Sequence, residues 1–137
     1  MLEIRGLDHI VLRTNQIDRM CAFYCDVLNC TVERETPPEL GLIQLRAGNA
    51  LIDLVRVESQ LGKMGGGAPT KTGNNLDHFC LQLKQTDEDT IAAHLASHGI
   101  DAGEFAKRYG AQGYGMSVYI KDPEGNTVEL RSEIVDN

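Results

Sequence analysis

The sequence predicts an α+β fold made of two tandem β-α-β-β-β modules whose strands form mixed sheets. Residues 7–12, Leu-Asp-His-Ile-Val-Leu, return as residues 76–81, Leu-Asp-His-Phe-Cys-Leu, with four of six positions identical. A Gly-Asn turn that leads into an apolar strand carrying one acid occurs at 48–54 and again at 125–130. Because both echoes come in the same order, each half begins with a histidine on a strand and ends with a carboxylate on a strand.

The elements of the first half follow from periodicity. Residues 9–14 alternate and are rich in β-branched side chains, which predicts a strand. Apolar residues then recur at helical spacing and predict an amphipathic helix over about 17–28. Three strands are expected near 30–35, 41–46 and 50–57, the last two joined by a Gly48-Asn49 turn typical of hairpins.

The second half restarts with a strand at 78–83, in which His78, Cys80 and Gln82 share one face. Thr86 is the expected cap of the next helix, and Gly99 lies just past its end. Further strands are expected near 100–106, 115–121 and 127–132, the last two separated by the turn Asp122-Pro123-Glu124-Gly125-Asn126. The glycine-rich run 109–116 predicts either a mobile flap or a hairpin.

A polar, glycine-rich stretch from residue 58 to residue 75 has no periodicity and indicates a linker. We therefore expect one domain over 1–137, made of module 1 (about 5–58), the linker (about 59–75) and module 2 (about 76–133).

Charge and composition exclude several classes of function. Thirteen Lys and Arg against 20 Asp and Glu give a formal charge of −7, which is the wrong sign for a nucleic-acid partner. The sequence holds no long apolar run and no recognisable signal peptide, so we expect a cytoplasmic protein with no membrane partner. The four cysteines form no CxxC pair and are expected to be reduced, small buried hydrophobes.

The repeated histidine and acid suggest a metal site built on a pseudo-two-fold. His9, His78 and Glu129 would supply two imidazoles and one carboxylate, with Asp53 in the remaining equivalent place. Such a ligand set suits one divalent metal ion, Fe(II), Mn, Co, Ni or Zn, and leaves positions open for substrate. The alternative from pattern alone is that these are satisfied core or surface histidines.

Several motifs resemble one known family. The opening residues 7–12, the Phe23-Tyr24 pair in a helix, and the ending 119–130, where Asp-Pro-x-Gly-Asn is followed by Glu129, are similar to the glyoxalase/bleomycin resistance/extradiol dioxygenase group. This group is the vicinal oxygen chelate (VOC) superfamily. The resemblance covers nearly the whole chain and implies a glyoxalase-like fold, with a cupped mixed sheet around a divalent metal, and a homodimer. It implies His9, His78 and Glu129 as metal ligands.

The resemblance also suggests roles for further residues. Asp53 is one methylene shorter than the acid of glyoxalase I, and it is either a fourth ligand, a ligand through water, or a substrate-contacting residue of the wall. Arg13 lies where glyoxalase I has an arginine that meets a carboxylate, so it is a candidate for binding substrate anions. Tyr119, ten residues before Glu129, matches a substrate-facing tyrosine of the extradiol and fosfomycin branches and is a catalytic candidate beside Glu129.

Four functions fit this pattern. The first is a metal-dependent lyase or isomerase of the glyoxalase I type, which chelates a small vicinal-oxygen substrate and stabilises an enediolate, with Glu129 as the base. An Fe(II) extradiol-type dioxygenase is the second. The third is a drug-binding module without chemistry, of the bleomycin resistance type, and the fourth is a fosfomycin-type thiol transferase. All four take a small molecule as partner, and the sequence favours an enzyme.

Overall fold

The computed structural model describes residues 1–134 and divides the chain into two compact units, Met1–Asn75 and the residues from Leu76 onward. Each unit holds one four-stranded mixed sheet, so the fold is α+β as the sequence predicts.

The first unit is built on the sheet β1-β4-β3-β2. The outer strand β1 runs parallel to β4, and the other neighbours are antiparallel. The strands are β1 (His9–Thr14), β2 (Thr31–Glu35), β3 (Leu42–Ala47) and β4 (Ala50–Arg56). Gly48, with φ of 60°, opens the two-residue turn between β3 and β4, a conformation that a side chain would disfavour.

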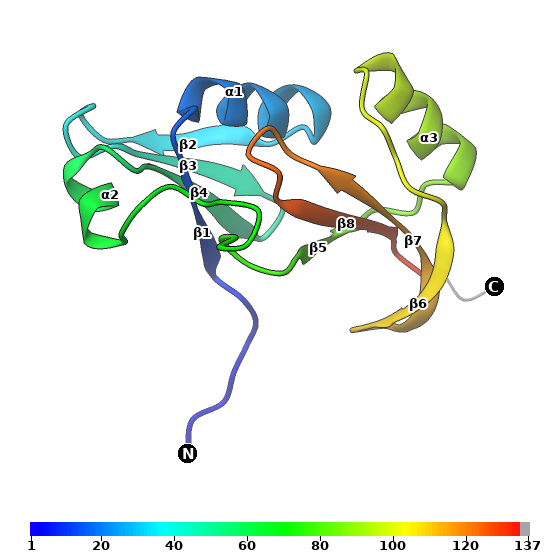
Figure 1. The fold of residues 1–137 in the computed structure, drawn as a ribbon. Helices are drawn as coiled ribbons and strands as arrows, with labels where there is room; N and C mark the ends of the chain where they lie inside the picture. The colour runs from blue at the N-terminus through cyan, green and yellow to red at the C-terminus, as the bar shows by residue number, and fades with distance from the viewer. Residues whose placement is uncertain (135–137) are drawn as a thin grey trace. The chain divides into compact units, whose positions relative to one another are not determined.

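One helix lies along one face of this sheet, as Figure 1 shows. It begins as α1 (Ile17–Ala22) and continues as a π-helical segment, η1 (Phe23–Val27), which fills the predicted range 17–28. Its fully buried Met20 and Tyr24 belong to the same core as Leu12, Leu45 and Leu54 of the sheet. Residues at the alternate strand positions point to the opposite face of the sheet, and the polar ones among them include His9, Arg13, Gln44 and Asp53.

The stretch predicted to be a linker contains a short helix that the sequence analysis does not predict, α2 (Gln60–Met64). The Ser59 side chain caps this helix by accepting a hydrogen bond from the Gly62 N–H at 3.0 Å. A Cβ at Gly62 would collide with the backbone of Arg56 and Val57, so this helix requires glycine there. Five residues are too few to show a helical period, which explains why the sequence pattern does not reveal α2.

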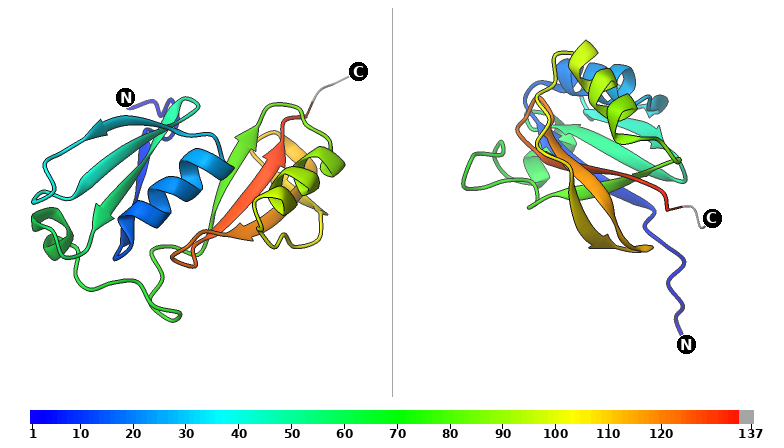
Figure 2. Two further views of the ribbon diagram at one scale, coloured as in Figure 1. Left: turned by 90° about the horizontal axis from the view of Figure 1, so that it is seen from above. Right: turned by 90° about the vertical axis from the view of Figure 1, so that its right-hand side faces the viewer.

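The second unit repeats the first in strand order and direction, with the sheet β5-β8-β7-β6 (Figure 2). Its strands are β5 (Phe79–Leu83), β6 (Ala106–Gly110), β7 (Gly113–Lys121) and β8 (Thr127–Ser132), and its helix is α3 (Glu88–Ser97). As in the first unit, the outer strand β5 is parallel to its neighbour β8. Buried Ile91 and Leu95 of α3 form a core with Val118, Ile120, Val128 and Leu130.

Two details of the second unit differ from the sequence prediction, and a third decides between two alternatives that the prediction left open. Asp87, and not Thr86, caps α3, by accepting a hydrogen bond from the Thr90 N–H at 2.7 Å. The strand expected at 100–106 lies instead at Ala106–Gly110. The glycine-rich run 109–116 is the hairpin of β6 and β7, closed by the pair Gly110 and Gly113. Among residues 1–134, no helix is long and apolar enough to cross a membrane.

Candidate functional site

In the second unit, two predicted ligands meet. His78 lies directly before β5, and Glu129 lies in the middle of β8 with 6% of its surface exposed. The His78 Nε2 atom is 3.4 Å from the Glu129 Oε1 atom. The other ring nitrogen, Nδ1, lies 2.6 Å from the Asp77 carboxylate. When Nδ1 donates its proton to Asp77, Nε2 keeps its lone pair for a metal, the usual arrangement of a metal-binding histidine.

Strand register places further polar residues around Glu129. Tyr119 of β7 and Cys80 of β5 are its partners on either side, and side chains at paired positions point to one face of the sheet. The Tyr119 ring meets the His78 ring edge to face, with centroids 5.5 Å apart. The Arg108 guanidinium lies 4.2 Å from the centre of the Tyr119 ring. The predicted catalytic pair, Glu129 and Tyr119, therefore shares one face with His78.

Cys80 corrects the prediction that all four cysteines are buried, because it is exposed on this face, while Cys30 is buried and Cys21 and Cys25 are half-buried. All four are free thiols. Desolvation of the sulfur, followed by the nearby Glu129 carboxylate, raises the pKa of the Cys80 thiol to about 11, while Arg131 acts in the opposite direction. At neutral pH Cys80 is therefore a thiol and not a thiolate.

In the first unit, His9 repeats the arrangement of His78. Its Nδ1 atom lies 2.7 Å from the Asp8 carboxylate, in the same Asp-His sequence. The hydrogen bond to Asp8, followed by the charge of Asp53, raises the pKa of the His9 imidazole. Each unit therefore carries an exposed Asp that orients its neighbouring histidine.

The acid of the first unit is held differently. Asp53 is 4% exposed, and both of its carboxylate oxygens accept from the Gln44 amide nitrogen, each at 3.2 Å. Gln44 pairs with Asp53 across β3 and β4, as Tyr119 pairs with Glu129 across β7 and β8. An amide therefore stands in the first unit where the second has a phenol.

Arg13, the predicted anion-binding residue, lies on the strand that carries His9. Its Nε and Nη2 atoms are buried and have no hydrogen-bond partner within residues 1–134. The side chain lies against the glycine-rich segment after α2, where a Cβ at Gly65 would be 3.1 Å from Nε. Glycine at this position therefore lets the chain pass directly over the guanidinium.

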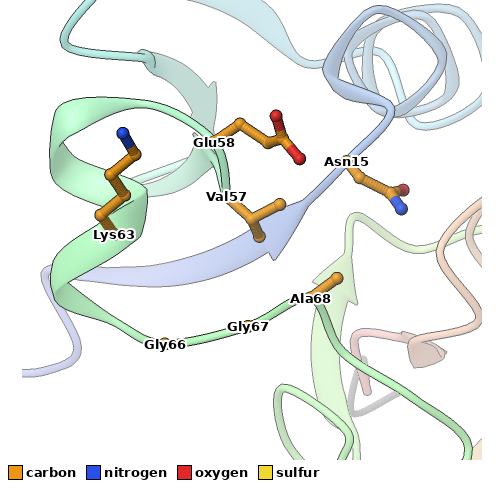
Figure 3. Close-up of a pocket in the computed structure, with 7 residues that line it drawn as sticks. All are labelled: Asn15, Val57, Glu58, Lys63, Gly66, Gly67 and Ala68. Carbon is orange, nitrogen blue, oxygen red and sulfur yellow. The ribbon is translucent and has the colours of Figure 1, made fainter.

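A hollow of about 440 Å³ lies in the same unit, and none of the predicted site residues lines it. In Figure 3 the segment from Gly66 to Ala68 passes opposite Val57 and Glu58, with Asn15 at the end of β1. Its charged lining residues, Glu58 and Lys63, are of opposite sign. The predicted chemistry is thus on the sheets and not in this hollow.

Sequence reasoning missed three polar residues of these faces, Gln44, Arg108 and Arg131. Arg131 is two residues after Glu129 on β8, so strand alternation alone puts both on one face. Gln44 holds the position in the first half of the repeat that Tyr119 holds in the second, so aligning the two halves identifies it. Arg108 follows only once β6 is placed at Ala106–Gly110, which the predicted strand at 100–106 prevents.

The donor set fits a divalent metal. Ligand bonds of about 2.1 Å bring two ligand atoms of one metal to roughly 3.0–3.4 Å from each other. The 3.4 Å between His78 Nε2 and Glu129 Oε1 agrees with that separation. Within either unit, across residues 1–134, no three His, Cys, Asp or Glu side chains gather to hold an ion. Each unit thus presents a pair of candidate ligands and no complete set.

Comparison with curated proteins finds relatives that match nearly the whole chain. The chain is 27% identical over 135 residues to a glyoxalase domain-containing protein of Mycosarcoma maydis, covering 96% of this chain and 70% of that protein. It is 32% identical over 133 residues to a biphenyl-2,3-diol 1,2-dioxygenase of Rhodococcus globerulus, covering 96% of this chain and 63% of the dioxygenase. The chain therefore spans about two thirds of these relatives.

Solved structures share the fold. An integron cassette protein from the mobile metagenome of V. cholerae matches with a TM-score of 0.75 and 26% identity over 98% of this chain and 99% of that protein. A lactoylglutathione lyase of Agrobacterium tumefaciens matches with a TM-score of 0.65 and 19% identity over 94% of each chain. The model of the Glyoxalase/Bleomycin resistance protein/Dioxygenase superfamily matches residues 6–130. The repeated modules, the Asp-His pairs and this match together establish that the chain belongs to that superfamily.

Proposed function

We propose that this protein is a metal-dependent, glyoxalase-like enzyme that acts as an isomerase or lyase on a small substrate with two adjacent oxygens. The observation that carries the proposal is the pair of His78 and Glu129, whose nitrogen and oxygen lie 3.4 Å apart on one face of the second unit. His9 is the third ligand that the repeat assigns, and its Nδ1 bond to Asp8 supports the assignment. Asp53 is a wall residue in this proposal, because Gln44 already binds both of its carboxylate oxygens.

The bound metal would act as a Lewis acid for negative charge that develops on the two substrate oxygens. The chain itself supplies the proton transfer. Glu129 takes a proton from the carbon beside one of these oxygens and returns it to the adjacent carbon, so that the isomerisation needs no oxidant or reductant. Tyr119, whose ring contacts His78 and Arg108, donates a hydrogen bond from its hydroxyl to a substrate oxygen.

Metal content tests the proposal. Mass spectrometry of protein grown with mixed Fe, Ni, Mn, Co and Zn should give near one equivalent per chain, and Glu129→Ala should lose it because one ligand is removed. Glu88→Ala removes an exposed carboxylate from α3 and should keep the metal. Wild-type protein without metal would contradict the proposal and favour a binding module of the bleomycin resistance type.

A ring-cleaving dioxygenase is the second candidate, and the 32% identity to the biphenyl-2,3-diol 1,2-dioxygenase favours it. Two histidines and one carboxylate form the facial triad of non-haem Fe(II) oxygenases. Oxygen consumption with catechol and Fe(II)-loaded protein distinguishes the two functions. Uptake of one O₂ per catechol supports the dioxygenase, and isomerisation of a hemithioacetal without O₂ uptake supports the glyoxalase-like enzyme.

We also propose that the protein works as a homodimer, since superfamily membership supports this state. Light scattering should give about twice the chain mass of 15.1 kDa. A mass equal to one chain at assay concentration would contradict the dimer.

A further inference from the structure

Three cations accompany Glu129 on one face of the second unit. Arg131 follows Glu129 on β8, while Lys121 lies two residues after Tyr119 on β7. Arg108 pairs with Gly115, which has the same parity as Tyr119, so it lies on this face as well. Although the chain carries a net charge of −7, the surroundings of Glu129 are locally basic. An acidic protein that gathers cations around its candidate site indicates an anionic ligand.

Arg131 is the buried member of this group. It is 3% exposed, its Nη2 atom donates to the Gly113 carbonyl at 2.9 Å, and its Nε–H has no acceptor within residues 1–134. No carboxylate of that part of the chain lies within ion-pair distance of its guanidinium, Glu129 included. Burying a cation with an unpaired N–H donor is unfavourable. A ligand whose anionic group pairs with this guanidinium removes that cost and therefore binds more tightly than a neutral ligand.

The hairpin of β6 and β7 is shaped around this guanidinium. A side chain at Gly110 would collide with Arg131 Nη1, and a Cβ at Gly115 would lie 2.8 Å from Nη2. The two glycines therefore leave the space that the Arg131 guanidinium occupies beside the hairpin. Arg108 is also fixed, because its Nη1 donates to the Ser117 carbonyl and hydroxyl at 2.6 Å and 3.0 Å. The glycine-rich run of the sequence thus has a physical role, which is to seat an arginine beside Glu129.

We propose that Arg131, supported by Arg108, forms a carboxylate-binding subsite, and that the substrate carries a carboxylate in addition to its two adjacent oxygens. The inference rests on the proposed function, because it places the adjacent oxygens at His78 and Glu129. Two residues along a strand span about 6.6 Å, a distance that a small organic acid bridges. Guanidinium donors bind carboxylates with strong, charge-assisted hydrogen bonds, so this subsite selects acids over neutral analogues.

Two diphenols test the subsite, because they have the same adjacent hydroxyls and differ by one carboxylate. Calorimetric titration of metal-loaded protein should show 3,4-dihydroxybenzoate binding at least about tenfold more tightly than catechol. Arg131→Gln should abolish the difference and leave catechol binding unchanged, which also shows that the variant is folded. Arg19→Gln, an exposed arginine of α1, should keep the difference. Equal affinities in the wild type, or a preference that survives Arg131→Gln, would overturn the proposal.

A second measurement needs neither a variant nor a metal. In ¹⁵N-labelled wild-type protein stripped with a chelator, the Nε–H resonance of Arg131 should shift on addition of 3,4-dihydroxybenzoate and stay in place with catechol. If this shift occurs in protein that never binds metal, the proposed metal chemistry fails and the subsite stands. If metal binds and the resonance does not move, the subsite fails and the metal chemistry stands.

Discussion

The two units share strand order and register but use their carboxylates differently. In the first unit, Asp53 is buried and accepts from Gln44 with both oxygens. In the second unit, Glu129 is equally buried, but its partner at the paired position is Tyr119, and its Oε1 faces the His78 imidazole. One duplicated framework thus holds a carboxylate engaged with its own sheet and a carboxylate aimed at a candidate ligand.

A repeated position in the two units therefore does not imply a repeated role. A buried carboxylate needs hydrogen bonds, and the Gln44 amide supplies them in the first unit. The longer Glu129 side chain reaches His78 Nε2, which the Asp77 carboxylate orients from the other side of the ring. Gln44 at the paired position therefore occupies Asp53, whereas Glu129 has Tyr119 beside it and faces an imidazole.

The largest expected effect comes from shortening the acid of the second unit. Glu129→Asp withdraws the carboxylate by one methylene, and metal affinity should fall at least about 100-fold. Losing a residue that only orients a metal ligand already costs up to about 100-fold, and a direct ligand should cost no less. Asp53→Asn keeps the bond to Gln44 and should change metal affinity less than about threefold. Competition with a fluorescent chelator measures both values. Equal losses in the two variants would contradict the difference between the units.

The second prediction concerns the free energy of unfolding, for which the larger effect is expected in the first unit and not in the second. Gln44→Leu leaves the Asp53 carboxylate buried without its amide partner and should lower the free energy of unfolding by about 2 kcal/mol. Tyr119→Phe at the paired position of the second unit keeps the ring contacts and should cost less than about 0.5 kcal/mol. Urea denaturation followed by circular dichroism measures both changes.

The double variant Gln44→Leu/Asp53→Leu is the control for the second prediction. Removing both polar partners leaves no unsatisfied group, so the double variant should recover most of the stability that Gln44→Leu loses. A double variant as unstable as the sum of its parts would show that the Gln44 amide acts through packing and not through Asp53.

The third prediction tests a feature that the units share. Asp77 lies 2.6 Å from the Nδ1 atom of His78, and Asp8 lies 2.7 Å from that of His9. Because each aspartate orients a predicted ligand, Asp77→Asn and Asp8→Asn should each weaken metal binding about tenfold. Asp89→Asn removes an equal charge from an exposed position in the first turn of α3 and should have no effect. Isothermal titration with Zn²⁺ gives the three affinities, and loss with Asp77→Asn alone would remove His9 from the ligand set.

Much of the fold follows from the sequence because the repeat fixes the order of the elements. The Leu-Asp-His echo marks β1 and β5, and the Gly-Asn turns mark the starts of β4 and β8. Two elements without such a marker, α2 and β6, are predicted poorly. The short α2 has too few residues to show a period, and β6, predicted at 100–106, is the outer strand of its sheet and carries no alternation that fixes its position.

For the site, the sequence predicts which residues matter better than how they are used. His78, Glu129 and Tyr119 lie together on one face as the repeat and the resemblance suggest. The engagement of Asp53 by Gln44 depends on a cross-strand pair, which only the register of β3 and β4 reveals. The seating of Arg131 under Gly110 and Gly115 depends on the hairpin, because the sequence shows the glycines but not what fills their space.

The smallest expected effect distinguishes the helix caps of the two units. Ser59 caps α2 with a hydroxyl that does not titrate, whereas Asp87 caps α3 with a carboxylate. Hydrogen bonds from the Thr90 side chain and N–H lower the pKa of Asp87 below its ordinary value of 3.8. A lowered acid pKa means that the contribution to stability is present above the ordinary value and is lost as pH falls through the lowered one.

Asp87→Ser, which keeps a hydroxyl cap without the charge, isolates this contribution. The urea midpoint of the wild type should exceed that of Asp87→Ser at about pH 7, and the gap should close toward about pH 2.5 as the carboxylate becomes protonated. Ser59→Ala serves as the comparison in the first unit, and the deficit from losing its uncharged cap should stay constant across the same range. A gap for Asp87→Ser that is equally independent of pH would mean that the α3 cap acts through geometry alone, as the α2 cap does.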